Sequence, residues 1–139
     1  MKNKLYRLSL AEKQHVISRL AEKMEGQKEV AFAYLYGSFI EDLPFHDIDV
    51  GIYLSETGEA EAGTFGVGLA SSLTRAIKLE VDVRVLNFAP VPFVFHVICG
   101  QVLFERAPEV RMRIVENAIR QYLDIKPVLY RAMKEAFAP

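Results

Sequence analysis

The chain has 139 residues, of which 51% are hydrophobic and 25% are charged, with 17 Lys and Arg against 18 Asp and Glu. This length and composition predict one globular domain over residues 1–139 and exclude an intrinsically disordered chain. A net charge of −1 argues against a protein that binds duplex DNA by neutralising phosphates, and a single cysteine excludes a disulfide framework.

The N-terminal segment, Met1 to Arg7, is charged and amphipathic rather than an apolar signal segment. The apolar runs elsewhere are shorter than the roughly 18 residues that a membrane-spanning helix requires. We therefore expect a cytoplasmic protein that does not associate with membranes.

The N-terminal half is predicted to contain one helix and then two strands. Ser9 and Glu12 have the spacing of a capping box, and apolar residues then recur every three or four positions up to a glycine. Residues 29–36 are almost continuously apolar, which is typical of a strand covered on both faces. Residues 47–54 alternate between polar and apolar and predict a second strand, whereas residues 55–64 are interpreted as a loop.

The C-terminal half is predicted to alternate between helices and strands. The expected elements are a helix over residues 65–78, a strand over 80–86, a short helix that ends at Cys99, a strand from Val102 to Glu105, and a long helical segment over about 108–137. Pro127 is expected to kink or break the last helix. This order predicts an α/β (α+β) fold, a small mixed sheet of about four strands flanked by helices.

Acidic residues are concentrated in the middle of the chain, where residues 40–82 hold nine Asp and Glu against two Lys and Arg. Asp47, Asp49 and Asp82 lie within apolar runs, on the strand faces opposite the Val and Ile residues. If the two strands are neighbours, the three carboxylates converge and repel one another, and a divalent cation would relieve the repulsion. Oxygen ligands without His or Cys favour Mg²⁺ or Mn²⁺ over Zn²⁺. The alternative is an ordinary solvated acidic surface.

Gly37 and Ser38 directly follow the first predicted strand. A glycine there lets the chain turn sharply and lets a ligand approach the backbone, while the exposed N–H groups and the serine hydroxyl suit phosphate oxygens. We interpret this pair as a phosphate-binding turn next to the acidic cluster. The alternative is a simple turn between two strands.

The segments Tyr36-Gly37-Ser38-Phe39, Asp47-Ile48-Asp49-Val50 and Val81-Asp82-Val83 together resemble the DNA polymerase β-type nucleotidyltransferase superfamily. Within it, the chain most resembles the minimal nucleotidyltransferase (MNT) domains of prokaryotes, over about residues 9–137. The segments from Gly100 to Arg106 and from Tyr122 to Pro127 add to this likeness.

The resemblance implies a metal-dependent transfer of a nucleoside monophosphate from an NTP, with ATP as the expected substrate. Asp47, Asp49 and Asp82 would be the catalytic residues and would hold two Mg²⁺ ions, with Mn²⁺ possible in their place. Gly37 and Ser38 would hold the β- and γ-phosphates. Many MNT domains are antitoxins that adenylylate a tyrosine of a helical HEPN-type toxin, and this is the function that the resemblance favours here.

Two other functions remain open from the sequence. The eight residues between Ser38 and Asp47 form a shorter segment than is usual in the family, and this agrees with a catalytically weak or inactive antitoxin that only binds its partner. A nucleotidyltransferase that modifies a small molecule, such as an antibiotic, is the third alternative.

Several residues near these motifs have simpler interpretations. Arg84 is expected to form an ion pair with one of the aspartates, and His46 to be an exposed loop residue. His96 is expected to lie in the core or an interface, and Cys99 to be a small buried apolar residue. Apolar residues near the C-terminus, around Tyr130, could serve an interface with a partner or in a homo-oligomer.

Overall fold

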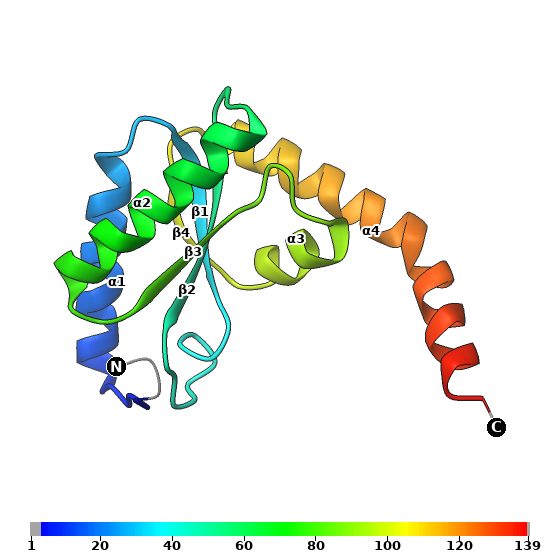
Figure 1. Cartoon of the computed structure of the whole chain (residues 1–139), viewed down its shortest axis with the longest axis horizontal. Helices are drawn as coiled ribbons and strands as arrows, with labels where there is room; N and C mark the ends of the chain where they lie inside the picture. The colour runs from blue at the N-terminus through cyan, green and yellow to red at the C-terminus, as the bar shows by residue number, and fades with distance from the viewer. Residues whose placement is uncertain (1–3, 139) are drawn as a thin grey trace.

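The computed structural model describes residues 4–138, which form four helices and four strands (Figure 1). In chain order these are α1 (Leu10–Glu25), β1 (Val30–Tyr36), β2 (Ile48–Leu54), α2 (Glu59–Ile77), β3 (Val81–Val85), α3 (Val91–Ile98), β4 (Gln101–Glu105) and α4 (Pro108–Ala136). Within these residues, no helix combines the length and the apolar character that are needed to cross a membrane.

The four strands form one mixed sheet in the order β3-β2-β1-β4. β1 pairs antiparallel with both β2 and β4, whereas β2 and β3 run parallel. Parallel neighbours need a crossover connection, and α2 provides it. The predicted fold class, a small mixed sheet flanked by helices, is confirmed.

Helices cover both faces of the sheet (Figure 1). On one face, α1 and α2 pack against the Val and Ile side chains of β2 and β3, including Val50 and Val83. On the other face, α3 and the first half of α4 pack against Phe32 and Tyr34 of β1. All seven residues of β1 are buried, which confirms the interpretation of its apolar run as a strand covered on both faces.

The capping box at the start of α1 is confirmed, since the Glu12 N–H donates to Ser9 Oγ and the Ser9 N–H donates to the Glu12 carboxylate. The start of α2 was predicted wrongly, because residues 59–64 are helical rather than a loop. Glu59 and Glu61 lie in the first helical turn, where negative charge interacts favourably with the helix dipole.

Pro127 was expected to kink or break α4, and of these two outcomes the break does not occur, since the helix continues through Pro127 to Ala136. The carbonyl that loses its helical N–H donor belongs to Leu123, which is 57% exposed, so water can satisfy it. The helix bends along its length, and its C-terminal half extends away from the sheet (Figure 1).

Candidate active site

The pairing of β2 with β3 brings the acidic residues together at one end of the sheet. The two strands are parallel and in register, so that Asp49 lies directly opposite Asp82, and Val50 lies opposite Val83. Asp47 directly precedes β2. The prediction of converging carboxylates required these two strands to be neighbours in the sheet, and they are.

The three carboxylates act electrostatically on one another. Burial, together with the negative charges of Asp47 and Asp82, raises the pKa of Asp49 to about 6, and the positive charge of Arg84 opposes this rise. Burial and neighbouring negative charge both disfavour the ionised carboxylate, and here both act on the same group. Asp49 is thus the central member of the cluster.

Arg84 lies on the same strand as Asp82 and pairs with it. Its Nε donates to Asp82 Oδ2 at 3.1 Å, and both side chains are partly open to solvent, at 62% and 37% exposure. The expected ion pair between Arg84 and an aspartate is confirmed. Because an exposed pair of this kind contributes about 0–1 kcal/mol, a ligand can displace Arg84 at low cost.

The turn after β1 lies against this cluster. Gly37 has a φ of +82°, which L-residues rarely adopt, and a Cβ at this position would collide with Asp49 Oδ2. The Ser38 carbonyl accepts from the N–H groups of Glu41 and Leu43, at 3.2 and 3.3 Å. Within residues 4–138 no acceptor engages the Ser38 hydroxyl or its backbone N–H. The turn therefore offers donors beside the carboxylates.

A family model for the polymerase beta nucleotidyltransferase domain matches residues 18–109. This range includes the turn after β1 and all three aspartates of the cluster. The chain belongs to the polymerase beta nucleotidyltransferase family. The superfamily resemblance that the sequence indicated is therefore confirmed.

Several solved structures share the fold of this chain. One of them is a chain of the tri-AMPylated Shewanella oneidensis HEPN toxin in complex with MNT antitoxin, which is 17% identical and has a TM-score of 0.72. The match covers 91% of this chain and 99% of that chain. A chain of the toxin-antitoxin MntA-HepT is 16% identical, with a TM-score of 0.71 and coverage of 90% and 99%. A chain of a toxin-antitoxin structure with AMP-PNP is 18% identical, with a TM-score of 0.72. The match covers 88% of this chain and 98% of that chain. No curated protein matches the chain by sequence.

The donor set of this acidic cluster suits Mg²⁺ or Mn²⁺, because it consists of carboxylate oxygens without His or Cys. The negative charges of Asp47 and Asp82 add to burial in raising the pKa of Asp49, and a cation bound here would offset them. Over the described residues, 4–138, no three His, Cys, Asp or Glu side chains are gathered as in a formed metal centre. One of the three carboxylates, Asp82, is paired with Arg84 instead.

Tyr36 belongs to the site as well, although the sequence analysis did not assign it a role. It lies opposite Asp49 in the β1–β2 register, is 7% exposed, and its ring makes edge-to-face contacts with Phe93 and His96 of α3. Burial and the nearby charge of Asp49 raise the pKa of Tyr36, so its phenol stays protonated and can donate a hydrogen bond. In the sequence, its position directly before Gly37 was the feature that could have indicated that Tyr36 lies near the site.

The structure also shows how exposed His46, His96 and Cys99 are, which can be compared with the burial expected for each from the sequence. His46 is exposed, as expected, with Nδ1 3.1 Å from the Lys4 carbonyl oxygen. His96 is exposed rather than in the core, although it contacts Tyr36. Cys99 is also exposed, so its predicted burial was wrong. It is the C-cap of α3 and lies off the buried stripe of that helix, which is formed by Val94 and Val97.

The raised pKa of Asp49 predicts pH-dependent stability in the metal-free protein. Because the folded-state pKa of about 6 exceeds the ordinary value of 3.8, the stabilising contribution is complete below about pH 4 and is lost as the pH rises through 6. Since this half-buried group is screened by water, we expect Asp49→Asn to stabilise the metal-free protein by about 1 kcal/mol at pH 8 and by about zero at pH 4. Urea denaturation in EDTA measures both values, and an equal effect at the two pH values would contradict the prediction.

Proposed function

We propose that this chain is a Mg²⁺-dependent nucleotidyltransferase that moves AMP from ATP to a tyrosine hydroxyl of a HEPN-type toxin and thereby acts as an antitoxin. The observation that carries the proposal is the pairing of Asp49 with Asp82 beside the turn at Gly37. An acidic cluster next to unengaged donors suits a metal-bound triphosphate.

The structural neighbours support the choice of nucleotide and acceptor. One neighbouring structure contains a tri-AMPylated HEPN toxin with an MNT antitoxin, and another contains a toxin-antitoxin pair with AMP-PNP. Both cover nearly all of this chain, so the same fold is present in proteins described as antitoxins. Since ATP is an intracellular substrate, the proposal places the protein in the cytoplasm.

The proposed roles follow from the position of each residue. Asp47 and Asp49 would hold the ion that accompanies the triphosphate, and Asp82 would join them in holding a second ion. When bound, two Mg²⁺ ions, or Mn²⁺ in their place, supply positive charge to the attacking and leaving oxygens. Gly37 and Ser38 bind the β- and γ-phosphates through N–H groups and the serine hydroxyl. The acceptor hydroxyl would lose its proton with the help of Asp82, and its oxygen would bond to the α-phosphorus as the bond to pyrophosphate breaks.

The surface of α4 supports a protein acceptor. Leu123, Tyr130, Met133 and Phe137 are between 57% and 85% exposed, on the part of the helix that extends from the sheet. A set of exposed apolar residues of this size is typical of a surface that binds another protein. We propose that the toxin binds along this helix.

The test is incubation of the wild-type protein with ATP, Mg²⁺ and the toxin that co-purifies with it, followed by mass spectrometry of the toxin. We expect a mass increase of one or more adenylyl groups on a tyrosine, and no increase in EDTA. Calorimetry with ATP and Mg²⁺ distinguishes the alternative function. Tight toxin binding without ATP binding or transfer would identify an inactive binding module and refute the enzymatic proposal.

A further inference from the structure

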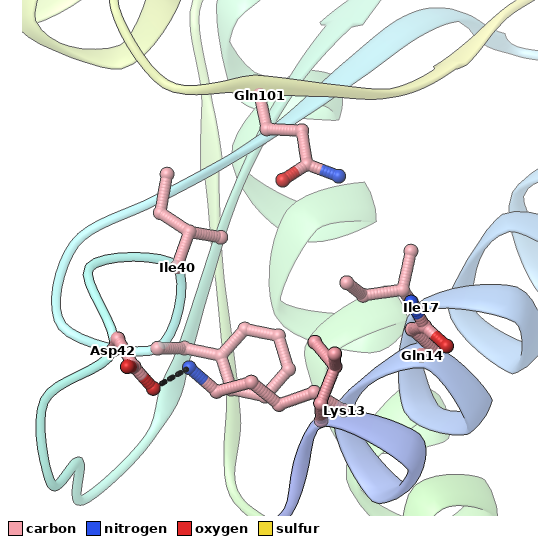
Figure 2. A pocket seen from close by; sticks show the side chains of 8 residues that line it. Lys13, Gln14, Ile17, Ile40, Asp42 and Gln101 are labelled. Carbon is pink, nitrogen blue, oxygen red and sulfur yellow. Dashed lines mark ion pairs between the residues drawn. The ribbon is translucent and has the colours of Figure 1, made fainter.

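Lys13 of α1 reaches across to the turn that follows β1. Its Nζ lies 3.7 Å from Asp42 Oδ1 and 5.2 Å from the centroid of the Phe39 ring. Figure 2 shows the Lys13 ammonium directed at the Asp42 carboxylate, with a dashed line for the ion pair. The side chain is 12% exposed. A single cation from a distant helix thus contacts two residues of the turn.

Lys13 is only partly buried, and its charge has two partners in the turn. Asp42 is a weak partner because its side chain is 98% exposed. The face of the Phe39 ring supplies a second attraction, worth about 0.5–1 kcal/mol or more when desolvated. The ammonium therefore contributes two attractions to the turn, one to Asp42 and one to the Phe39 ring.

The turn itself has little regular structure to hold it. Its backbone hydrogen bonds are long, at 3.2–3.3 Å, and Asp42 has a φ of +58° in the left-handed region. For residues other than glycine this conformation costs about 1 kcal/mol and needs support from its surroundings. Phe39 provides one anchor, since it is fully buried against Phe45. Lys13 provides the other, because it joins Phe39 to Asp42.

A cavity leaves the turn poorly supported on the side of α1. It has a volume of about 540 Å³ and is lined by α1 residues, by Phe39, Ile40 and Asp42 of the turn, and by Gln101 (Figure 2). Lys13 and Asp42 both line this cavity, so their ion pair is a polar contact between α1 and the turn at its wall.

We propose that Lys13 is a positioning residue for nucleotide binding. Its ammonium holds the turn from Phe39 to Asp42 in place, and this fixes the neighbouring Ser38 donors relative to Asp49. The inference rests on the proposed function, because it assumes that Ser38 binds the phosphates of ATP. It predicts an effect on ATP binding rather than on the chemical step, since the contacts to the terminal phosphates persist through the reaction.

The experiment compares Lys13→Met, Lys13→Arg and Asp42→Asn with the wild type in toxin adenylylation and in ATP calorimetry. Methionine keeps the apolar stem and removes the charge, so we expect KM and Kd for ATP to rise about tenfold with kcat within about twofold. Arginine should restore most of the affinity, and Asp42→Asn should raise KM about two- to threefold. Lys23→Met is the matched control, because Lys23 lies exposed at the other end of α1 and should have no effect.

The outcomes separate this inference from the proposed function. A wild-type protein that neither binds ATP nor modifies the toxin refutes the proposed function, and the inference fails with it. An active wild type with unchanged KM in Lys13→Met overturns the inference alone, as does an equal rise in Lys23→Met. If Lys13→Met does not fold, Asp42→Asn decides, because its side chain is exposed, and an unchanged KM in this variant overturns the inference.

Discussion

Asp49→Asn is expected to abolish nucleotide transfer while leaving the fold intact. Asp49 lies at the centre of the acidic cluster, between Asp47 and Asp82, and its carboxylate is the one that adjoins the turn at Gly37. An amide of the same shape cannot neutralise a divalent cation. We expect the rate of toxin adenylylation to fall by about 10³-fold or more, because electrostatic stabilisation of the transition state is the main catalytic contribution.

The control for this prediction is Glu59→Gln, which removes an exposed carboxylate from α2 and should leave the rate unchanged. Stability provides a second check. Since Asp49→Asn is expected to stabilise the metal-free protein at pH 8, a loss of activity cannot be explained by unfolding. A variant that retained activity within about tenfold of the wild type would contradict the assignment of Asp49 as a metal ligand.

Gly37→Ala is expected to impair both the fold and the activity. Alanine at a φ of +82° is strained by about 1–2 kcal/mol, and its Cβ would also collide with Asp49 Oδ2. To relieve the collision, either the turn or the Asp49 carboxylate must move. We expect a loss of about 2 kcal/mol in unfolding free energy and a fall of about 100-fold in kcat/KM for ATP, because displacement by about 1 Å can have this effect.

Gly68→Ala is the matched control for the glycine substitution. Gly68 lies in α2, and no atom lies within 4 Å of where its Cβ would be. Alanine is the better helix former by about 1 kcal/mol, so this variant should be more stable and equally active. Equal activity of Gly37→Ala and the wild type would refute the role of the turn.

Local periodicity predicted most of the secondary structure. The two-residue alternation in β2 and β3 placed Val50 and Val83 on one face and the aspartates on the other, as the structure has them. The errors occurred where a local preference is weak or is overridden. The first turns of α2 are rich in glycine and glutamate, which made a helix hard to distinguish from a loop, and Pro127 is tolerated because α4 is exposed around it.

The sequence by itself determined the family, the strands and the faces on which Asp47, Asp49 and Asp82 lie, because these depend on residue type and on short, regular spacing. Only the tertiary structure decided that Asp82 lies opposite Asp49 and pairs with Arg84. It alone also revealed the contacts of Tyr36 with α3 and of Lys13 with the turn after β1. These contacts join residues distant in the chain, and which segments meet is set by strand order and helix packing across the whole core, which no local pattern encodes.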